Sequence, residues 1–307
     1  MAEIQQGNIQ NVMELTMSAG TVLVLNATGK VGLNVCRALK EAGFEVCGTT
    51  RSRGDKLREI DVKPVICDYT VRGDLDRAFL ETGAKKVFSI TDYFGAAKSR
   101  SNTEIQHGKN AIDAAKSANV DHFIFVSVTD AEFFNEHVTH IKTKVVIEDY
   151  LRKSEIPYSI LRPTAFFENF DDPKNWNPLK KGSIKFLTKK RIKFCATYDI
   201  GRAAAIMLKN PEEWLGRSLE VIGWEGNLAD VAAALEKVGG VPVKYSLAMP
   251  IFLRRLFLKD LHNMFLYFEA GGPKGTPDEF RQVVPDALSA EDWFRFHCYY
   301  SNGERIC

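Results

Sequence analysis

Residues 21–51 read TVLVLNATGKVGLNVCRALKEAGFEVCGTTR, and this stretch decides the fold. An apolar run, Thr21–Leu25, leads into a turn that carries Gly29 and Gly32; a helix-forming segment follows, and a second apolar run, Phe44–Thr50, closes the unit. Strand, glycine turn, helix and strand in this order are typical of the first half of a dinucleotide-binding unit. A pyrophosphate approaches the backbone of such a turn closely, so a Cβ atom would block it, while free N–H groups and the helix dipole hold the anion.

The turn departs from the usual glycine pattern at its first position. Residues 26–32 read NATGKVG, with Asn26 where the fingerprint usually has glycine. Asparagine adopts positive φ more readily than other non-glycine residues, so we expect the turn to keep its shape. The alternative is an ordinary strand-to-helix turn of an α/β protein.

The end of the second strand indicates which dinucleotide binds. An NAD site usually has Asp or Glu there, on the ribose hydroxyls. Here the strand ends in Thr49-Thr50-Arg51-Ser52-Arg53, and the first acid is Asp55. A cationic strand end suits the 2′-phosphate of NADP, so the sequence predicts NADP(H) as the cofactor, with Arg51 on that phosphate.

Strands and helices continue to alternate up to residue 170. The expected strands are 64–67, 86–91, 122–128 and 158–162, and the expected helices are 102–117 and 142–153. This alternation predicts an α/β fold, a Rossmann-type doubly wound parallel sheet with a smaller C-terminal lobe. We expect residues 1–20 to be a flexible tail and 21–170 to be the NADP-binding domain, with 195–223 returning to it; 171–194 and 224–307 would form the smaller substrate or partner lobe.

Composition excludes several classes of function. The net charge is only +2, which predicts no direct contact with nucleic acid or a membrane surface. No apolar run reaches the roughly 20 residues of a membrane helix, and the six cysteines show no paired spacing, so we expect a cytoplasmic protein, with the nucleus as the alternative. His137 and His140 have no matching acid or cysteine cluster, so no metal site is predicted.

Two later segments are unusual in composition. The basic run 180–193, KKGSIKFLTKKRIK, is expected to be a solvated hairpin, and the alternative is a nuclear-import or docking patch. Residues 247–270 are predicted to be helical and are rich in aromatic side chains.

Several phrases of the sequence together match one family. They are NATGKVG (26–32), TTRS (49–52), VICDYT (65–70), HGKNAIDAAKSANVDHFIFVS (107–127), HIKTKVVIEDYLRKSEIPYSILRPTAFFENF (140–170), YDIGRAAAIML (198–208) and DALSAEDWFRFH (286–297). With them the chain resembles the NmrA-like family of atypical short-chain dehydrogenases/reductases over nearly everything from residue 21 to residue 297. The resemblance implies a cofactor domain, a smaller C-terminal lobe and a cleft between the two.

The resemblance also implies which residues bind the cofactor. It places the pyrophosphate on the turn, the adenine near Asp68 and Tyr69, and the nicotinamide-side ribose beside Thr91. The implied cofactor-binding residues are Asn26, Thr28, Gly29, Lys30, Val31, Gly32, Arg51, Asp68, Tyr69, Thr91, Lys144, Pro163, Thr164 and Phe166.

The wider superfamily of short-chain dehydrogenases/reductases uses a Ser, a Tyr and a Lys four residues after the Tyr as its catalytic group. The resemblance assigns Ser127 and Lys144 to the first and last of these positions, and the Tyr position is taken by His140. Histidine donates protons well near neutral pH, and Lys144 alone is a second candidate donor. The alternatives are a His140 that only caps or packs, a solvated Lys144 and an ordinary strand-end Ser127.

Three functions remain open from the sequence. The first is an NADPH-dependent reductase of a small apolar carbonyl, enone or imine compound. The second is a non-catalytic, NADP(H)-responsive regulator that binds a partner protein. The third is a cofactor-bound enzyme of non-redox chemistry, a cyclisation or an isomerisation. The aromatic residues expected to line a substrate pocket are Tyr93, Phe94, Phe167 and Trp176, with ordinary core packing as the alternative.

Overall fold

The structure is a computed structural model that describes residues 19–132, 138–175 and 177–307. Its centre is a seven-stranded sheet with the strand order β10-β6-β5-β4-β1-β2-β3, in which every pair of neighbours is parallel. The strands are β1 (Thr21–Val24), β2 (Glu45–Thr50), β3 (Lys63–Ile66), β4 (Lys86–Ile90), β5 (His122–Val126), β6 (Tyr158–Pro163) and β10 (Ser218–Val221). The predicted doubly wound parallel sheet is therefore confirmed.

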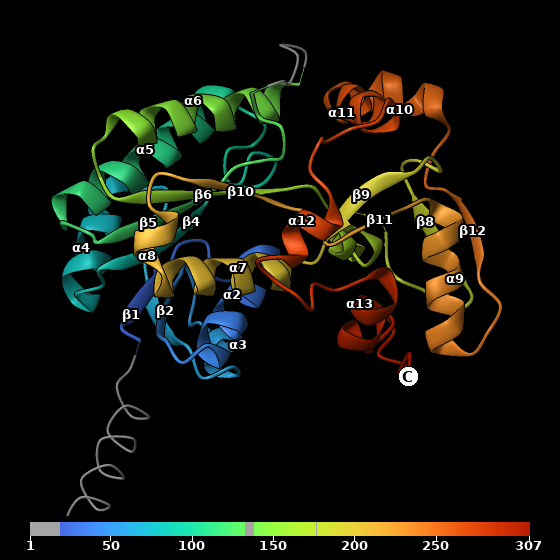
Figure 1. The fold of residues 1–307 in the computed structure, drawn as a ribbon, viewed down its shortest axis with the longest axis horizontal. Helices are drawn as coiled ribbons and strands as arrows, with labels where there is room; N and C mark the ends of the chain where they lie inside the picture. The colour runs from blue at the N-terminus through green and yellow to red at the C-terminus, as the bar shows by residue number, and fades with distance from the viewer. Residues whose placement is uncertain (1–18, 133–137, 176) are drawn as a thin grey trace, which may run out of the picture.

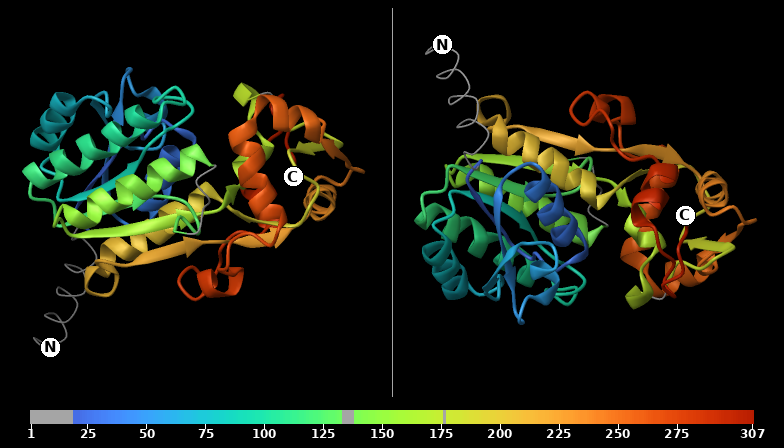
Figure 2. Two further views of the ribbon diagram at one scale, coloured as in Figure 1. Left: turned by 90° about the horizontal axis from the view of Figure 1, so that it is seen from above. Right: turned by 90° about the horizontal axis from the view of Figure 1, so that it is seen from below.

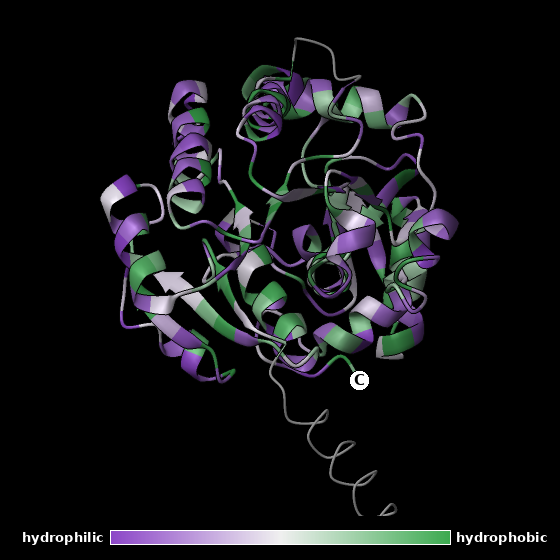
Figure 3. Cartoon of the chain, turned by 60° about the vertical axis from the view of Figure 1, so that its left-hand side comes forward, coloured by the Kyte–Doolittle hydropathy of each residue, from purple (hydrophilic) through white to green (hydrophobic). Residues whose placement is uncertain are grey.

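Helices cover both faces of this sheet (Figure 1). One face carries α2 (Lys30–Glu41), α3 (Asp55–Arg58), α7 (Thr197–Lys209) and α8 (Pro211–Trp214), and the other carries α4 (Arg72–Thr82), α5 (Ser101–Ser117) and α6 (Thr139–Lys153). Strand β5 shows why its sequence is apolar throughout: Phe123 and Phe125 enter the core below α5 and α6, whereas Ile124 and Val126 enter the core below α2 and α7. The helices alternate between hydrophobic and hydrophilic residues along their length, as amphipathic helices do (Figure 3).

The smaller lobe follows β6 and lies beside the carboxyl end of the sheet (Figure 2). It contains one sheet of β7 (Ala165–Phe166), β9 (Ile192–Cys195) and β11 (Trp224–Gly226), and a second of β8 (Ser183–Phe186) and β12 (Lys244–Leu247). Its helices are α9 (Leu228–Gly239), α10 (Ile251–Phe257), α11 (Lys259–Glu269) and α13 (Ala290–His297), with 3-10 turns η1 (Phe167–Phe170) and η2 (Pro173–Asn175). Helix α12 (Pro277–Arg281) returns to the large sheet, where it packs on β10 and buries Phe280 in the sheet's core. Aromatic rings dominate its core.

The expected hairpin over residues 180–193 is wrong. Its two strands belong to different sheets, because β8 pairs with β12 and β9 pairs with β7 and β11. The strands are close in sequence, but each finds its hydrogen-bonding partners in segments that come earlier or later in the chain. The basic segment is thus a crossing between two sheets.

Candidate active site

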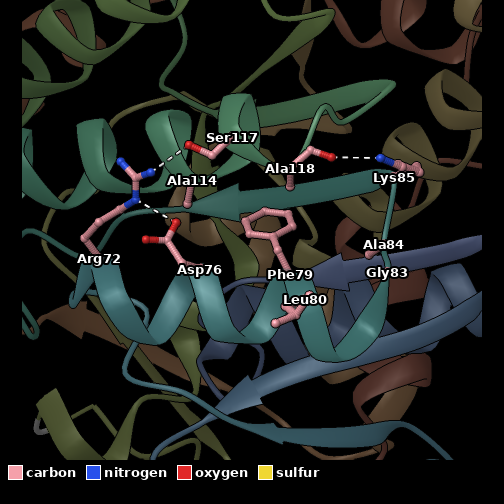
Figure 4. A pocket seen from close by; sticks show the side chains of 10 residues that line it. All are labelled: Arg72, Asp76, Phe79, Leu80, Gly83, Ala84, Lys85, Ala114, Ser117 and Ala118. Carbon is pink, nitrogen blue, oxygen red and sulfur yellow. Dashed lines mark hydrogen bonds and ion pairs between the residues drawn. The ribbon is translucent and has the colours of Figure 1, made fainter.

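The fold brings the implied cofactor-binding positions to one edge of the sheet. Except for Lys144, which lies on helix α6, each of them lies at or a few residues beyond the last residue of a parallel strand, and parallel strands end at the same edge. The turn of residues 26–32 follows β1, Arg51 follows β2, Asp68 follows β3, Thr91 follows β4, and Ser127 follows β5. Pro163 ends β6, and Thr164 and Phe166 follow it. A depression of about 510 Å³ between α4 and α5 lies elsewhere, because Gly83–Lys85 in its lining precede β4 at the opposite edge (Figure 4).

The turn after β1 has the geometry that a phosphate site needs. Asn26 has a φ of +56°, the positive value predicted for it. Its backbone N–H donates to Thr49 Oγ1 of β2 at 3.0 Å, and its carbonyl accepts the Gly29 N–H at 3.1 Å. A Cβ atom on Gly32 would lie 2.2 Å from the Asn26 carbonyl oxygen, so only glycine fits where the helix packs on the turn. Thr49 is a supporting residue that the sequence analysis did not identify.

The start of α2 fits an anion. The cap residue Gly29 offers no side chain, and the first turn contains no acid. In the described part of the chain, the N–H groups of Lys30, Val31 and Gly32 have no acceptor. Free N–H groups and the positive end of the helix dipole are the features that hold a pyrophosphate. Thr28 is exposed beside them, and the Val31 side chain is buried, so Val31 can contribute only its backbone.

Lys30 points across to the smaller lobe. Its ammonium forms an ion pair of 2.7 Å with Asp172 and donates to the Glu168 carbonyl at 3.2 Å. The side chain that the resemblance assigns to the pyrophosphate therefore also ties the turn to the 3-10 segment after β7.

Two exposed arginines, Arg51 and Arg53, follow β2 at the end where the resemblance places the adenosine. Arg51 is exposed, and among the described residues it has no hydrogen-bond or ion-pair partner. The Asp68 carboxylate accepts a hydrogen bond from the Thr70 hydroxyl at 2.7 Å. Tyr69 is buried edge-on to His107, and its hydroxyl group has no hydrogen-bond partner among the described residues. The Arg53 side chain is also exposed and without a hydrogen bond or ion pair in the described chain, and Arg51 is the nearer of the two to the end of β2.

Lys144 lies in a buried polar network. Its ammonium is 2.8 Å from Glu104 Oε1, 3.0 Å from the Thr91 carbonyl and 2.5 Å from the Thr91 hydroxyl. Glu104 is fully buried on α5, and its second carboxylate oxygen accepts the Thr143 hydroxyl. Burial of Glu104 opposes its ionisation, but the Lys144 ion pair and the hydrogen bonds from Thr143 and Thr91 outweigh this and lower its pKa. Lys144 is therefore fixed beside Thr91 rather than solvated.

His140 connects the two lobes. Its Nδ1 bonds to the carboxylate of Asp260 at the start of α11, and that carboxylate also accepts the Thr139 N–H at 2.5 Å and the His140 N–H at 3.3 Å. Asp260 thereby caps the start of α6 from the other lobe; burial opposes its ionisation, but these bonds outweigh burial and lower its pKa. No hydrogen bond to His140 Nε2 is found within the described residues.

Of the other predicted site residues, some lie beside His140 and one lies in the core of the smaller lobe. Ser127 is buried, and its hydroxyl has no hydrogen-bond partner in the described chain, which is unusual for a buried polar atom. Tyr93 and Phe94 lie with ring centroids 6.0 and 5.3 Å from the His140 ring. Phe167 does not line an open pocket: it is 0 % exposed and stacks on Trp293 in the core of the smaller lobe.

Beyond β6, Thr164 is buried and its hydroxyl donates to the Lys193 carbonyl at 3.0 Å, and Phe166 is half-buried. Trp176 and His137 lie outside the described residues, as do residues 1–18 of the expected tail. Within the described ranges, no group of three His, Cys, Asp or Glu side chains is arranged to hold a metal ion, and no helix has the length and apolarity to cross a membrane.

A model of the NmrA-like family matches residues 18–293. The chain belongs to the NmrA-like family. Photosystem II assembly factor Ycf39 of Cyanophora paradoxa is 25 % identical to it over 269 residues, which cover 82 % of this chain and 77 % of that protein.

Solved structures share the fold of this NmrA-like protein. Triphenylmethane reductase from Citrobacter sp., complexed with NADP(H), matches with a TM-score of 0.71 and 18 % identity over 89 % of this chain and 98 % of that one. NmrA, a negative transcriptional regulator in complex with NADP, matches with a TM-score of 0.69 and 21 % identity over 89 % and 93 % of the two chains. The fold is thus one on which other proteins bind NADP(H).

Proposed function

We propose that this NmrA-like protein is an NADPH-dependent reductase of a small apolar carbonyl, enone or imine compound. The observation that carries the proposal is the arrangement of Lys144, Thr91 and Glu104 at the carboxyl edge of the sheet, one helical turn after His140. Keeping a charged lysine beside a buried acid costs folding free energy, whereas a solvated lysine on a helix costs none. Such a pair therefore suits a functional role better than a solvated lysine does.

The residues present fit the cofactor. The turn of residues 26–32 would hold the pyrophosphate, Arg51 the 2′-phosphate, and Lys144 with Thr91 the ribose next to the nicotinamide. When bound, NADPH supplies a hydride to the substrate. The triphenylmethane reductase whose fold this chain shares was solved with NADP(H), which supports a reductase on this scaffold.

The protein would supply the proton. Asp260 engages His140 Nδ1, so Nε2 faces away from the carboxylate and is the ring atom available to a substrate. Ser127, with its unsatisfied hydroxyl, is a candidate to hydrogen-bond the substrate oxygen. Tyr93 and Phe94 beside His140 give the site an apolar wall that suits an apolar compound.

The test is NADPH oxidation, followed at 340 nm, with a panel of quinones, enones and imines. We expect His140→Ala to lower turnover by about 10²–10⁴-fold, the usual contribution of a positioned general acid, with little change in NADPH affinity. Lys144→Ala should lower both. Lys142→Ala is the matched control, because Lys142 lies exposed on the same helix. Turnover that survives both active-site changes would contradict these assignments.

A second candidate is an NADP(H)-responsive regulator that binds a partner protein. Lys30 favours it, because phosphate binding at the turn would compete with the Lys30–Asp172 ion pair between the lobes. This function predicts no turnover with any substrate. NADPH would instead change the affinity for a partner, and the partner would change NADPH affinity by the same factor.

A further inference from the structure

Helix α10 exposes its apolar residues and buries an arginine. Ile251, Phe252, Leu256 and Phe257 are 53, 68, 70 and 71 % exposed, while Arg254 is 1 % exposed. Arg254 donates to the Leu187 carbonyl at 2.8 Å and forms an ion pair of 3.2 Å with Glu269 of α11. On the adjoining α11, Leu266 is 50 % exposed as well. We call these five exposed apolar residues, which lie on two helices that pack together, the α10 face. Single exposed apolar residues are common, but several large ones on adjoining helices indicate a binding surface.

Four exposed cations lie on or next to α10, and one of them, Lys189, lies over the Tyr245 ring at 5.5 Å from its centroid. Arg255 and Lys259 are exposed on the same pair of helices, and Lys189 and Lys190 are exposed on the turn that the Arg254–Leu187 hydrogen bond joins to α10. Within the described chain none of these four has an ion-pair partner. The acids of α11 are already engaged, Asp260 by His140 and Glu269 by Arg254.

We propose that the α10 face docks on an anionic lipid membrane surface. A short helix with exposed Phe, Leu and Ile side chains and with Lys and Arg beside them has the character of a helix that lies in a membrane interface. Each such cation strengthens binding to an anionic bilayer about five-fold. Residues 187–191, which connect β8 to β9, would thus contribute Lys189 and Lys190 to membrane binding, a role that the sequence analysis did not assign to them.

The charges favour this occupant over two others. A second copy of the chain would bring the same four cations against themselves in a two-fold contact, and like charges repel. Protein–protein interfaces are depleted of lysine relative to the remaining surface, whereas three of the four cations here are lysines. The net charge of +2, which predicted no membrane contact, averages over the whole surface and does not report this local cluster.

The α10 face is close to the candidate active site. Phe257 ends α10, and Asp260, which holds His140, is the second residue of α11. Docking would place the His140–Asp260 contact near the bilayer, although the docking proposal does not depend on the proposed reductase activity.

The experiment is flotation of the purified full chain with vesicles of phosphatidylcholine alone and with about one-third phosphatidylglycerol. We expect binding to the anionic vesicles and little binding to the neutral ones. Phe252→Ser with Phe257→Ser should weaken anionic binding by at least about ten-fold, and Arg255→Glu with Lys259→Glu should remove the preference for anionic lipid. Leu80→Ser is the matched control, because Leu80 is a large apolar residue that is 86 % exposed on α4, away from the α10 face. The Leu80→Ser variant should float as the parent does.

Thermal unfolding and NADPH affinity equal to the parent show that each variant is folded. Three results would overturn the proposal. The first is that the parent does not float with either kind of vesicle. The second is that the double serine variant floats as well as the parent. The third is that light scattering shows a dimer for the parent and a monomer for the double serine variant. The last result would assign the α10 face to a contact between copies of the chain.

Discussion

Asn26 sets the shape of the turn that faces the cofactor edge. Its positive φ is natural for glycine and tolerable for asparagine, and the Thr49 hydroxyl holds its N–H from the neighbouring strand. The position in sequence was enough to predict this φ. The Thr49 contact could not be predicted, because it depends on which strands pair in the sheet.

The turn can be tested at Asn26. Asn26→Gly should retain NADPH binding, whereas Asn26→Val should weaken it about ten-fold or more, because a β-branched residue resists positive φ. Calorimetric titration with NADPH measures both. A valine variant that binds like the parent would show that the backbone can reach the cofactor in another conformation.

Arg51 is expected to determine the choice of dinucleotide. A charge-assisted contact to the 2′-phosphate contributes about 1.5–3 kcal/mol, so Arg51→Ala should reduce NADP(H) affinity by roughly ten- to a hundred-fold. NAD(H) affinity should change little, because NAD lacks that phosphate. Lys116→Ala is the control, since Lys116 is an exposed cation paired with Glu155 and lies outside the site. Equal affinity of the parent for the two cofactors would refute the assignment.

At the scale of elements, periodicity and apolar runs predicted most of the strands and the long helices. Helix α4 was not identified, because it carries many charges and buries only Leu75, Ala78 and Phe79. Glu104 was also missed, although its spacing to Gly108 and Ala111 puts an acid on the buried face of α5. A charged residue at a core position of a helix is a signal that could have pointed to the partner of Lys144.

The Glu104–Lys144 ion pair is expected to contribute to the free energy of unfolding. Glu104→Gln leaves Lys144 without its countercharge in a buried position, so the free energy of unfolding should fall by about 3–5 kcal/mol. The folded pKa of Glu104 is lowered, so its contribution is present at neutral pH and is lost as the pH falls through that folded value. Urea unfolding measures the change. Glu155→Gln, at an exposed ion pair, should cost no more than about 1 kcal/mol, and equal losses in the two variants would contradict the buried pair.

At the scale of the whole molecule, residues far apart in the sequence join the two lobes. The His140–Asp260 and Lys30–Asp172 contacts and the Tyr267 hydroxyl, which donates to Asp130 at 2.5 Å, each connect the Rossmann-type lobe with the smaller one. A single sequence gives no signal for such pairs. This is why the sequence placed His140 in the site but did not reveal the acid that orients it.

Glu220, on edge strand β10 of the large sheet, is expected to make the stability depend on pH. Its carboxylate accepts a hydrogen bond from the Thr129 hydroxyl at 2.5 Å. Burial raises the pKa of Glu220 to about 7, with a smaller contribution from the negative charge of Asp130. The hydrogen bond from Thr129 and the positive charge of Arg162 act in the opposite direction but do not outweigh burial. An acid with a raised folded pKa binds its proton more tightly in the folded state, so stability falls as the pH rises from about 4.5 to 7.

Glu220→Gln should remove this part of the pH dependence, on the order of 1–3 kcal/mol between pH 5 and 8. Urea unfolding at a series of pH values measures it. The exposed Glu212→Gln is the control and should leave the profile unchanged. A Glu220→Gln variant whose profile parallels the parent's would place the titration elsewhere.

The path of the chain through the lobes has a consequence for protein synthesis. Edge strand β10 and helix α7, whose Ile200 and Ala203 share a core with Val22 and Val24, follow the first segment of the smaller lobe in the chain. A growing chain that has emerged from the ribosome only as far as β6 therefore lacks one edge of the sheet and the part of one face that α7 covers beside α2. The apolar residues that α7 covers stay open to solvent until residue 209 has emerged, and exposed apolar surface of this kind is prone to aggregation.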